Sequence, residues 1–203
     1  MEGYDRYENI SADEYDEYLK RGLLGSLIGK KSNEIIIPML TRIKGKDILE
    51  LGCGTGRYTQ YLCRDNEVIC VDINPHLFKL KDKVRIIKGL AEDIQKLVGN
   101  RKFDYICSFF MTEYVSKTGI EKIINQCAHI LKNEGRIIFT FITPGILGLA
   151  YIWGAKLKGI RKYFYTYNEI KKICRENNLS IDKIERIKRF GFEFGCVIVF
   201  KRM

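Results

Sequence analysis

The chain has 203 residues, of which 46% are hydrophobic and 30% charged, a composition typical of one globular domain rather than of a disordered or fibrous chain. It contains no run of about 18 apolar residues, which argues against a membrane-spanning helix. Its acidic start lacks the basic and then apolar segments of a signal peptide. The seven cysteines form no CxxC pair. We therefore expect a cytoplasmic protein with reduced thiols and no metal site.

The net charge of +10 is unevenly distributed, because an acidic segment at residues 1–20 precedes a strongly basic remainder. A basic body can attract nucleic acid, an anionic membrane surface or an anionic substrate. It can equally be a solvated, Lys-rich surface, and the basic residues form no dense stripe.

The first half of the chain alternates between helical and strand patterns. Residues 13–40 carry apolar side chains at helical spacing and predict a helix with Pro38 near its boundary. Residues 46–51 predict a strand that glycines stop, and 57–64 a helix. Residues 67–72, 84–88 and 103–110 predict three more strands, with a short helix after the Asn74-Pro75 turn.

The second half continues the alternation. Residues 119–132 predict an amphipathic helix, which Gly135 is placed to end in the left-handed conformation. A strand is expected over 136–142, and a capping box at Thr166–Glu169 predicts a helix to about residue 178. The last strands, near 181–188 and 192–201, are too close together for a crossover helix and must form an antiparallel hairpin.

These elements predict the fold class. Strands that alternate with helices form a parallel sheet covered on both faces. We expect a doubly wound α/β fold with a mostly parallel seven-stranded sheet, a C-terminal antiparallel hairpin and an N-terminal helical lid, all in a single domain over residues 1–203.

A Gly-rich loop follows the first predicted strand. Gly52, Gly54 and Gly56 let the backbone turn sharply and let a ligand approach it closely, although a tight strand–helix turn also uses this pattern. Asp72 ends the second strand, where a carboxylate can accept both hydroxyls of a ribose. The G-x-G-x-x-G pattern of dinucleotide binders is absent, so a pyrophosphate is disfavoured.

Five segments in order carry a family resemblance. Residues 48–56, Ile-Leu-Glu-Leu-Gly-Cys-Gly-Thr-Gly, resemble motif I of the class I (Rossmann-like) S-adenosylmethionine-dependent methyltransferases. Residues 71–75, 88–94, 103–115 and 131–138 resemble the motifs that follow it in that family. Within the family, these motifs most resemble those of the small-molecule group that includes the ubiquinone and menaquinone methyltransferases.

The resemblance implies S-adenosylmethionine (SAM) as cofactor and S-adenosylhomocysteine (SAH) as product. Glu50 would hold the ammonium group of SAM, directly or through water, and Asp72 its ribose. The resemblance implies that the cofactor-binding residues are Glu50, Gly52, Cys53, Gly54, Gly56, Asp72, Ile73, Ala91, Glu92, Ser108 and Phe109. For Ile73, Ala91 and Phe109 the alternative is ordinary core packing without a role in binding.

The chain departs from this group at the end of the fourth strand. The group often has Glu-His-Val there, whereas this chain has Glu113-Tyr114-Val115. Any role of that histidine as a base does not carry over to Tyr114, since the ordinary pKa of tyrosine is about 10. Tyr114 remains the one candidate catalytic residue, and Glu113 a second candidate for contact with the acceptor.

Two segments are candidates to cover the acceptor. One is the N-terminal lid over residues 1–40, which contains Tyr4, Tyr7, Tyr15 and Tyr18. The other is an insert over residues 143–165, apolar and aromatic around Trp153 and basic at its end. This insert can cover a lipophilic acceptor, touch a membrane surface or form a helix packed on the core. We expect an apolar or aromatic small-molecule acceptor.

Other functions remain open. The basic body favours an RNA or protein methyltransferase of the same fold. Residues 107–111, Cys-Ser-Phe-Phe-Met, lack the Asn/Asp-Pro-Pro-Tyr/Phe motif of many amino-methylating enzymes, which disfavours nucleic-acid base amines but not every nucleic-acid target. A nucleotide-binding module without catalysis is the alternative from another class, as is a protein that keeps the cofactor without transfer. The sequence determines neither the methylated atom nor the oligomeric state.

Overall fold

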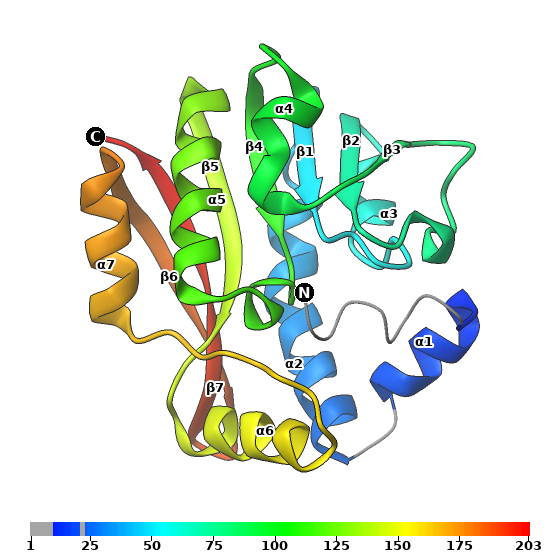
Figure 1. Cartoon of the computed structure of the whole chain (residues 1–203), viewed down its shortest axis with the longest axis vertical. Coiled ribbons are helices and arrows are strands. Elements are labelled where there is room, and N and C mark those ends of the chain that lie inside the picture. The colour runs from blue at the N-terminus through cyan, green and yellow to red at the C-terminus, as the bar shows by residue number, and fades with distance from the viewer. Residues whose placement is uncertain (1–9, 21–22) are drawn as a thin grey trace.

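The computed structural model describes residues 10–20 and 23–203. Its centre is a seven-stranded sheet in the order β3-β2-β1-β4-β5-β7-β6 (Figure 1). β1 to β5 run parallel to one another, and β7 is antiparallel to both β5 and β6. The strands are β1 (Asp47–Leu51), β2 (Glu67–Asp72), β3 (Arg85–Lys88), β4 (Phe103–Ser108), β5 (Leu131–Ile142), β6 (Leu179–Arg189) and β7 (Phe192–Arg202). The expected mostly parallel sheet with a C-terminal antiparallel hairpin is confirmed.

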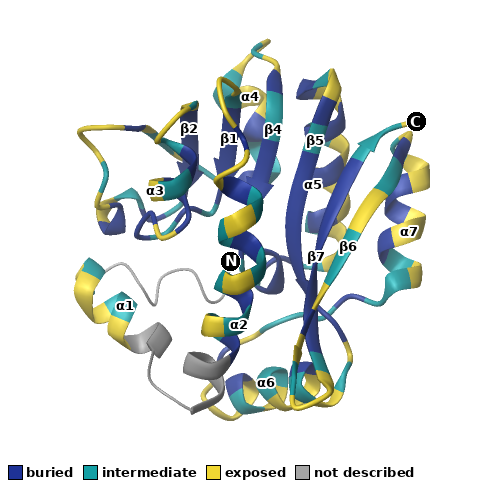
Figure 2. Ribbon diagram, turned by 180° about the vertical axis from the view of Figure 1, so that it is seen from behind, coloured by how far each residue is buried: buried dark blue, intermediate teal, exposed yellow. Residues whose placement is uncertain are grey.

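Helices cover both faces of the sheet (Figures 1 and 2). α2 (Leu23–Leu40) and α3 (Thr59–Leu62) lie on one face. α4 (Ile94–Val98), α5 (Lys117–Ile130) and α7 (Tyr167–Glu176) lie on the other. Successive residues of a strand point to opposite faces, so Ile48 packs with the first set and Leu49 with the second. The remaining elements are α1 (Ala12–Lys20), α6 (Ile146–Leu157), η2 (Pro75–Leu77), η3 (Ala91–Asp93) and η4 (Thr112–Tyr114).

The N-terminal region divides into two helices with different surroundings. α2 is part of the core, because Ile36 and Leu40 are fully buried on the sheet and Pro38 lies in the last turn of the helix. α1 lies beside η2, at the end of the sheet where β1 and β2 stop (Figure 1). Tyr4 and Tyr7 of the expected lid lie outside the described residues, as does the side chain of Tyr18.

The prediction for Gly135 was wrong. α5 ends at Ile130, and β5 begins at the next residue, so Gly135 lies inside the strand and is absent from the glycines with positive φ. A Cβ on Gly135 would lie 2.8 Å from the Leu131 side chain and 3.0 Å from the Asp104 carbonyl oxygen. Glycine is needed there for close packing rather than for a helix stop.

The other helix predictions differ in extent. The helix expected over residues 57–64 is reduced to Thr59–Leu62, because the glycine loop occupies the residues before it. The capping box is confirmed: Thr166 Oγ1 accepts from the Glu169 amide at 3.2 Å, and the Thr166 amide donates to Glu169 at 2.8 Å.

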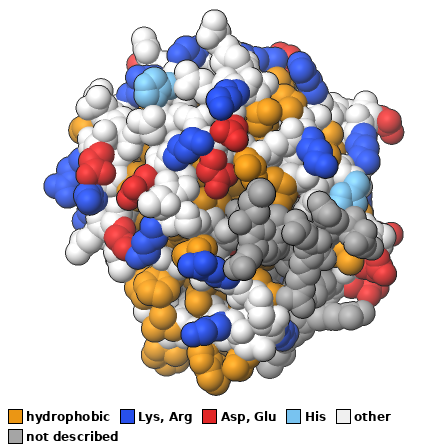
Figure 3. Space-filling view, in the orientation of Figure 1, with side chains coloured by type: hydrophobic (Ala, Val, Ile, Leu, Met, Phe, Trp, Pro, Cys, Tyr) orange, Lys and Arg blue, Asp and Glu red, His pale blue; other side chains and the backbone are white. Residues whose placement is uncertain are grey.

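The insert over residues 143–165 contains α6, which has two unlike faces. Gly148 and Ala155 are buried against the sheet end, where Thr143 N donates to Phe194 O. The outward face carries large exposed hydrophobic side chains, Ile146, Leu149, Trp153 and Leu157. Hydrophobic side chains gather at the lower edge of Figure 3, where Figure 1 places α6 and the turn between β6 and β7. Among the helices described, none is long and apolar enough to cross a membrane.

Candidate functional site

The site lies where the strand order changes direction. β1 is flanked by β2 and β4, so the loops that leave the carboxyl ends of these strands diverge and open a crevice. Two pockets lie in this crevice and share one wall. The residues that line both are Tyr15, Gly52, Gly54, Phe110 and Tyr114.

The glycine loop forms the shared wall. Gly52 and Gly54 have φ values of +67° and +54°, which favour glycine. A Cβ on Gly52 would lie 2.6 Å from Cγ of Met111, so the loop backbone and the residues after β4 approach too closely for any side chain. A Cβ on Gly54 would lie 3.8 Å from the Tyr15 ring, an ordinary contact, and the bare backbone of Gly54 therefore faces the pockets.

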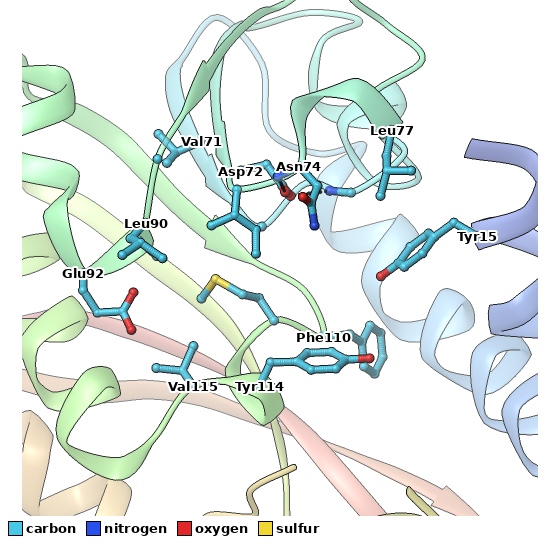
Figure 4. A pocket seen from close by; sticks show the side chains of 16 residues that line it. Tyr15, Val71, Asp72, Asn74, Leu77, Leu90, Glu92, Phe110, Tyr114 and Val115 are labelled. Carbon is cyan, nitrogen blue, oxygen red and sulfur yellow. Dashed lines mark hydrogen bonds between the residues drawn. The ribbon is translucent and has the colours of Figure 1, made fainter. Parts of the chain in front are cut away.

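Asp72 holds the end of β2 against this loop. One of its carboxylate oxygens accepts from the Gly54 amide at 2.8 Å, and the other accepts from the Asn74 amide at 2.8 Å. A carboxylate has about four acceptor positions, so two remain for further donors. Asp72 lines the first pocket, and Figure 4 shows it beside Asn74 at the upper edge of that pocket.

Glu50 is a carboxylate buried at the end of β1. Its side chain is 1% exposed at the wall of the second pocket, and Thr59 Oγ1 donates to it at 2.6 Å. Burial raises the pKa of Glu50 to about 8, the Thr59 hydrogen bond opposes the shift and the charge of Asp72 adds to it. A cationic group entering the second pocket would favour the charged form of this carboxylate.

The first pocket combines apolar side chains with carboxylates. Val71, Ile73 and Leu90 supply apolar surface between β2 and the loop after β3. Ala91 and Glu92 close the side of the pocket, and the Glu92 carboxylate points into it (Figure 4). This lining suits a flat heterocycle joined to a group that bears hydroxyls.

The second pocket is largely aromatic. Tyr58, Phe109 and Phe110 form a ring cluster, with centroids 4.8 Å apart for Tyr58–Phe109 and 6.3 Å for Tyr58–Phe110. Tyr151 and Phe194 also line it, with ring centroids 5.2 Å apart. Cys53 and Arg57 also line this pocket.

Most residues expected in the site come together. Gly52, Gly54 and Tyr114 line both pockets; Asp72, Ile73, Ala91 and Glu92 line the first; Glu50, Cys53 and Phe109 line the second. Gly56 and Ser108 line neither. A Cβ on Gly56 would lie 3.1 Å from Phe78 and from Leu80, so this glycine faces away from the pockets. The Ser108 side chain is fully buried, and its hydroxyl has no hydrogen-bond partner among the described residues.

Phe110 is a site residue that the sequence did not reveal. It lines both pockets in a left-handed conformation, with φ of +60°, which is rare for a bulky residue and occurs mainly where the surroundings enforce it. Its amide donates to Thr140 Oγ1 of β5 at 2.6 Å. No local sequence pattern signals this conformation, because the enforcing partner is thirty residues away.

The sequence also did not reveal that Lys162 is buried against residues that line the second pocket. The sequence placed it in the basic end of the insert, but its side chain is only 5% exposed. Lys162 Nζ lies 3.1 Å from Glu113 Oε1, and it donates to Tyr114 OH at 2.9 Å and to Tyr151 OH. The aromatic run that follows, Tyr163-Phe164-Tyr165, was the available signal for burial.

α1 closes the outer side of the pockets. Tyr15 projects from α1 toward them (Figure 4). Polar contacts hold the helix: Lys79 Nζ lies 2.7 Å from Asp13 and 2.6 Å from Asp16, and Thr55 Oγ1 donates to Asp16 at 2.8 Å. Trp153, by contrast, is 65% exposed on α6 and lines neither pocket; Tyr151 is the residue of the insert that does.

Comparisons with known proteins agree with this geometry. The family described as the methyltransferase domain matches residues 48–135. A malonyl-[acyl-carrier protein] O-methyltransferase of Priestia megaterium is 26% identical over an alignment that covers 89% of this chain and 72% of that protein. A ubiquinone biosynthesis O-methyltransferase of Xylella fastidiosa is 25% identical over 72% of this chain; the chain spans 65% of its length.

Solved structures share the fold across nearly the whole chain. The magnesium protoporphyrin IX methyltransferase of Synechocystis PCC 6803 with bound SAH has a TM-score of 0.76 and 15% identity, and the match covers 98% of each chain. An S-adenosylmethionine-dependent methyltransferase of Clostridium acetobutylicum has a TM-score of 0.71 and 17% identity, over 94% of this chain and 98% of the other. The chain carries a methyltransferase domain and has the fold of the class I, Rossmann-like methyltransferases, and together these findings make it an S-adenosylmethionine-dependent methyltransferase.

Proposed function

We propose that this methyltransferase acts on an oxygen of a small-molecule acceptor with an apolar or aromatic body. One observation carries the proposal: two pockets of different chemistry adjoin at Gly52, Gly54 and Tyr114. The first has the apolar surface and carboxylates that an adenosine group needs, and the second is lined by aromatic rings. Oxygen is the methylated atom named for the relatives in Priestia and Xylella.

The residues of the crevice fit SAM. The bare backbone at Gly54 gives a cradle that a side chain would fill, and Asp72 keeps acceptor positions for the two ribose hydroxyls. Ile73, Ala91 and Glu92 would border the adenine. Glu50 would hold the ammonium group, whose charge would offset the cost of burying this carboxylate.

The chemistry that SAM supplies when bound is a methyl group already activated on a sulfonium centre. The chain's own contribution is then to hold the acceptor in line with that methyl group and to exclude water. Phe109, Phe110 and Tyr151 are suited to hold an apolar acceptor. Tyr114, at the junction of the pockets, is the candidate catalytic residue.

We infer that residues 1–203 act as one methyltransferase domain with two covering segments. α1 supports the lid role of the N-terminal region through Tyr15, whereas α2 belongs to the core. Tyr151 supports a role of the 143–165 insert in covering the acceptor. Six of the seven cysteines are buried and all are free, which supports the reducing environment of the cytoplasm.

We also propose a peripheral contact of α6 with an anionic membrane. Its outward face joins Ile146, 64% exposed, to Trp153 and Leu157, 65% and 69% exposed. Lys156, Lys158 and Arg161 are exposed beside this apolar face. Apolar side chains rimmed by cations are what an interfacial helix presents to anionic lipid.

Calorimetry with SAM, SAH and NAD tests the cofactor assignment. We expect binding of SAM and SAH and none of NAD; binding of NAD alone would contradict the proposal.

A screen of phenols, carboxylic acids, amines and RNA, read by SAH release, then tests the acceptor. Transfer to RNA, with binding that weakens steeply as salt rises, would instead support an RNA methyltransferase of the same fold. If the protein binds SAM but transfers its methyl group to none of these acceptor classes, the result would support a cofactor-binding protein without methyl transfer.

A further inference from the structure

A buried cluster of charged and phenolic side chains forms part of the wall of the second pocket. It joins Lys162, from the segment after α6, to Glu113 and Tyr114 of η4 and to Tyr151 of α6. The side chains of Lys162 and Glu113 are 5% and 3% exposed. Forty-nine residues separate these two partners along the chain, so only the fold brings them together.

Stability alone is a poor explanation of this cluster. Removing two charges from water costs several kcal/mol per ion, and apolar residues of similar volume often serve as well. The surroundings of Lys162 nevertheless stabilise its positively charged form. Its Nζ lies 4.1 Å from the ring centroid of Tyr114 and 4.3 Å from that of Tyr151, beside the Glu113 carboxylate. Burial lowers the pKa of Lys162, and the charge of Glu113 opposes that change.

Both phenol oxygens accept a hydrogen bond from Lys162 Nζ, but Tyr151 OH also donates to a carboxylate. Tyr151 OH donates to Glu113 Oε1 at 3.0 Å, which favours the protonated form of Tyr151. Tyr114 OH accepts from Lys162 Nζ at 2.9 Å, and a cation that donates to a phenol oxygen favours the phenolate. Tyr114 is also the one of the two that borders both pockets.

We propose that Lys162 is a positioning residue that holds Tyr114 as a phenolate base, so that the acceptor site takes a compound with an ionisable hydroxyl, such as a phenol or an enol. The proposal rests on the proposed methyl transfer to oxygen. The acceptor hydroxyl gives its proton to the Tyr114 oxygen while the acceptor oxygen forms its bond to the methyl carbon. The carbon–sulfur bond breaks, and its electron pair stays on sulfur, which leaves SAH and a neutral Tyr114.

Other titratable groups also face this base. They line the pockets or contact Tyr114, and are Tyr15 of α1, Glu50 of β1, Cys53, Arg57 and Tyr58 before α3, Asp72 of β2, Glu92 of η3, Glu113 of η4, Tyr151 of α6 and Lys162. A pH profile of the reaction alone would therefore not identify Tyr114, and the test has to observe this side chain directly.

Carbon-13 NMR of the free protein, labelled at the Cζ atoms of tyrosine, provides that test without cofactor or acceptor. The resonance that disappears in Tyr114→Phe should titrate at least about one pH unit below the ordinary tyrosine pKa of about 10. The resonance that disappears in Tyr151→Phe should not titrate below the ordinary tyrosine range. In the double variant Glu113→Gln/Lys162→Met, which leaves no unpaired charge, the Tyr114 resonance should return to the ordinary range.

Three results would overturn the proposal: an ordinary titration of Tyr114 in the wild type, no change in the double variant, or a low titration that belongs to Tyr151. The single variant Lys162→Arg keeps the charge and should keep most of the shift. Failure of SAM to bind in calorimetry would overturn the proposed function while leaving this titration in place, so the two failures are distinguishable.

Kinetics supply the second measurement, with catechol as the phenol probe and benzoate as the carboxylate probe. Tyr114→Phe should lower kcat for catechol by about 10²–10⁴-fold, the usual contribution of a general base. The KM for SAM should change less than about threefold, since removal of one hydroxyl leaves uniform cofactor binding intact. Equal rates of the wild type and Tyr114→Phe on catechol, or turnover of benzoate alone, would contradict a phenolate base.

Discussion

Glu50 shows how one buried side chain can link cofactor binding to stability. The carboxyl has an ordinary pKa of 4.5 in the unfolded chain and one of about 8 in the folded protein. Between these values the folded state keeps a proton that the unfolded state releases. The free energy of unfolding therefore falls as pH rises through this window, and the full cost is present above pH 8.

Replacement of this carboxyl should expose the linkage. Glu50→Gln should flatten the pH dependence and make the cofactor-free protein more stable at pH 8.5, by an amount on the order of a few kcal/mol. The same variant should bind SAM about ten- to a hundredfold more weakly, because a charged hydrogen bond contributes about 1.5–3 kcal/mol.

Urea unfolding at pH 5.5 and 8.5 measures the first effect, and calorimetry with SAM measures the second. Glu134→Gln, at an exposed position of β5, is the matched control and should change neither. If the free energy of unfolding depends on pH equally in Glu50→Gln and the wild type, the Glu50 carboxyl is not the source of that dependence.

α6 shows how an element can be required by the fold on one face and free on the other. Its inner face packs so closely on the ends of β5 and β7 that a Cβ on Gly148 would lie 2.0 Å from Thr143 O and 2.8 Å from Phe194 O. On the same helix, a Cβ on Gly154 would meet no atom of the described residues within 4 Å. Close packing therefore determines the effect of a substitution at Gly148, whereas helix propensity determines it at Gly154.

Alanine at these positions should have opposite effects. Gly148→Ala should destabilise the protein by about 1–3 kcal/mol, because backbone atoms must move. Gly154→Ala should stabilise it by about 0.5–1 kcal/mol, since alanine loses less entropy in a helix. Urea unfolding of both variants checks the pair, and similar destabilisation by both would contradict the close docking of α6.

The outward face of α6 carries its own reporter, because Trp153 is the single tryptophan of the chain. Phosphatidylserine-containing vesicles should shift its fluorescence to shorter wavelength, whereas phosphatidylcholine vesicles should not, and added salt should weaken the effect. Leu149→Ser/Leu157→Ser should abolish binding while keeping the reporter. An unchanged spectrum with anionic vesicles would remove the membrane proposal.

At the scale of the whole molecule, the site is assembled from both halves of the sheet. The loops after β1, β2, β3 and β4 line the first pocket, while residues of α6 and β7 line the second. A ligand in this crevice contacts elements that are far apart in the chain. Its binding should therefore stabilise the global fold rather than one loop.

SAH should raise the melting temperature accordingly. At a hundred times its Kd, a ligand that binds only the folded state adds about 2.7 kcal/mol. For a chain of this size that corresponds to roughly 5–11 °C. Calorimetric melting with SAH, with NAD as the control, measures the shift; an equal shift with NAD would point to a general nucleotide site.

The alternation of strands and helices along the chain, the C-terminal hairpin, the glycine loop and the acidic end of β2 are features that the sequence by itself determined. Each depends on neighbours within a few residues or on connection length, as in the short turn that makes β6 and β7 antiparallel. The motifs around Glu50, Asp72 and Glu92 were recognisable for the same reason, since each one ends or follows a single strand.

Only the tertiary structure decided the acceptor side. Lys162 looks like one more surface cation in the sequence, and its pairing with Glu113 depends on how α6 returns across the end of the sheet. The left-handed Phe110 and the packing of Gly135 likewise depend on distant partners, Thr140 and Asp104. Local patterns report what neighbours in the chain impose, whereas these contacts form between segments that only folding brings together.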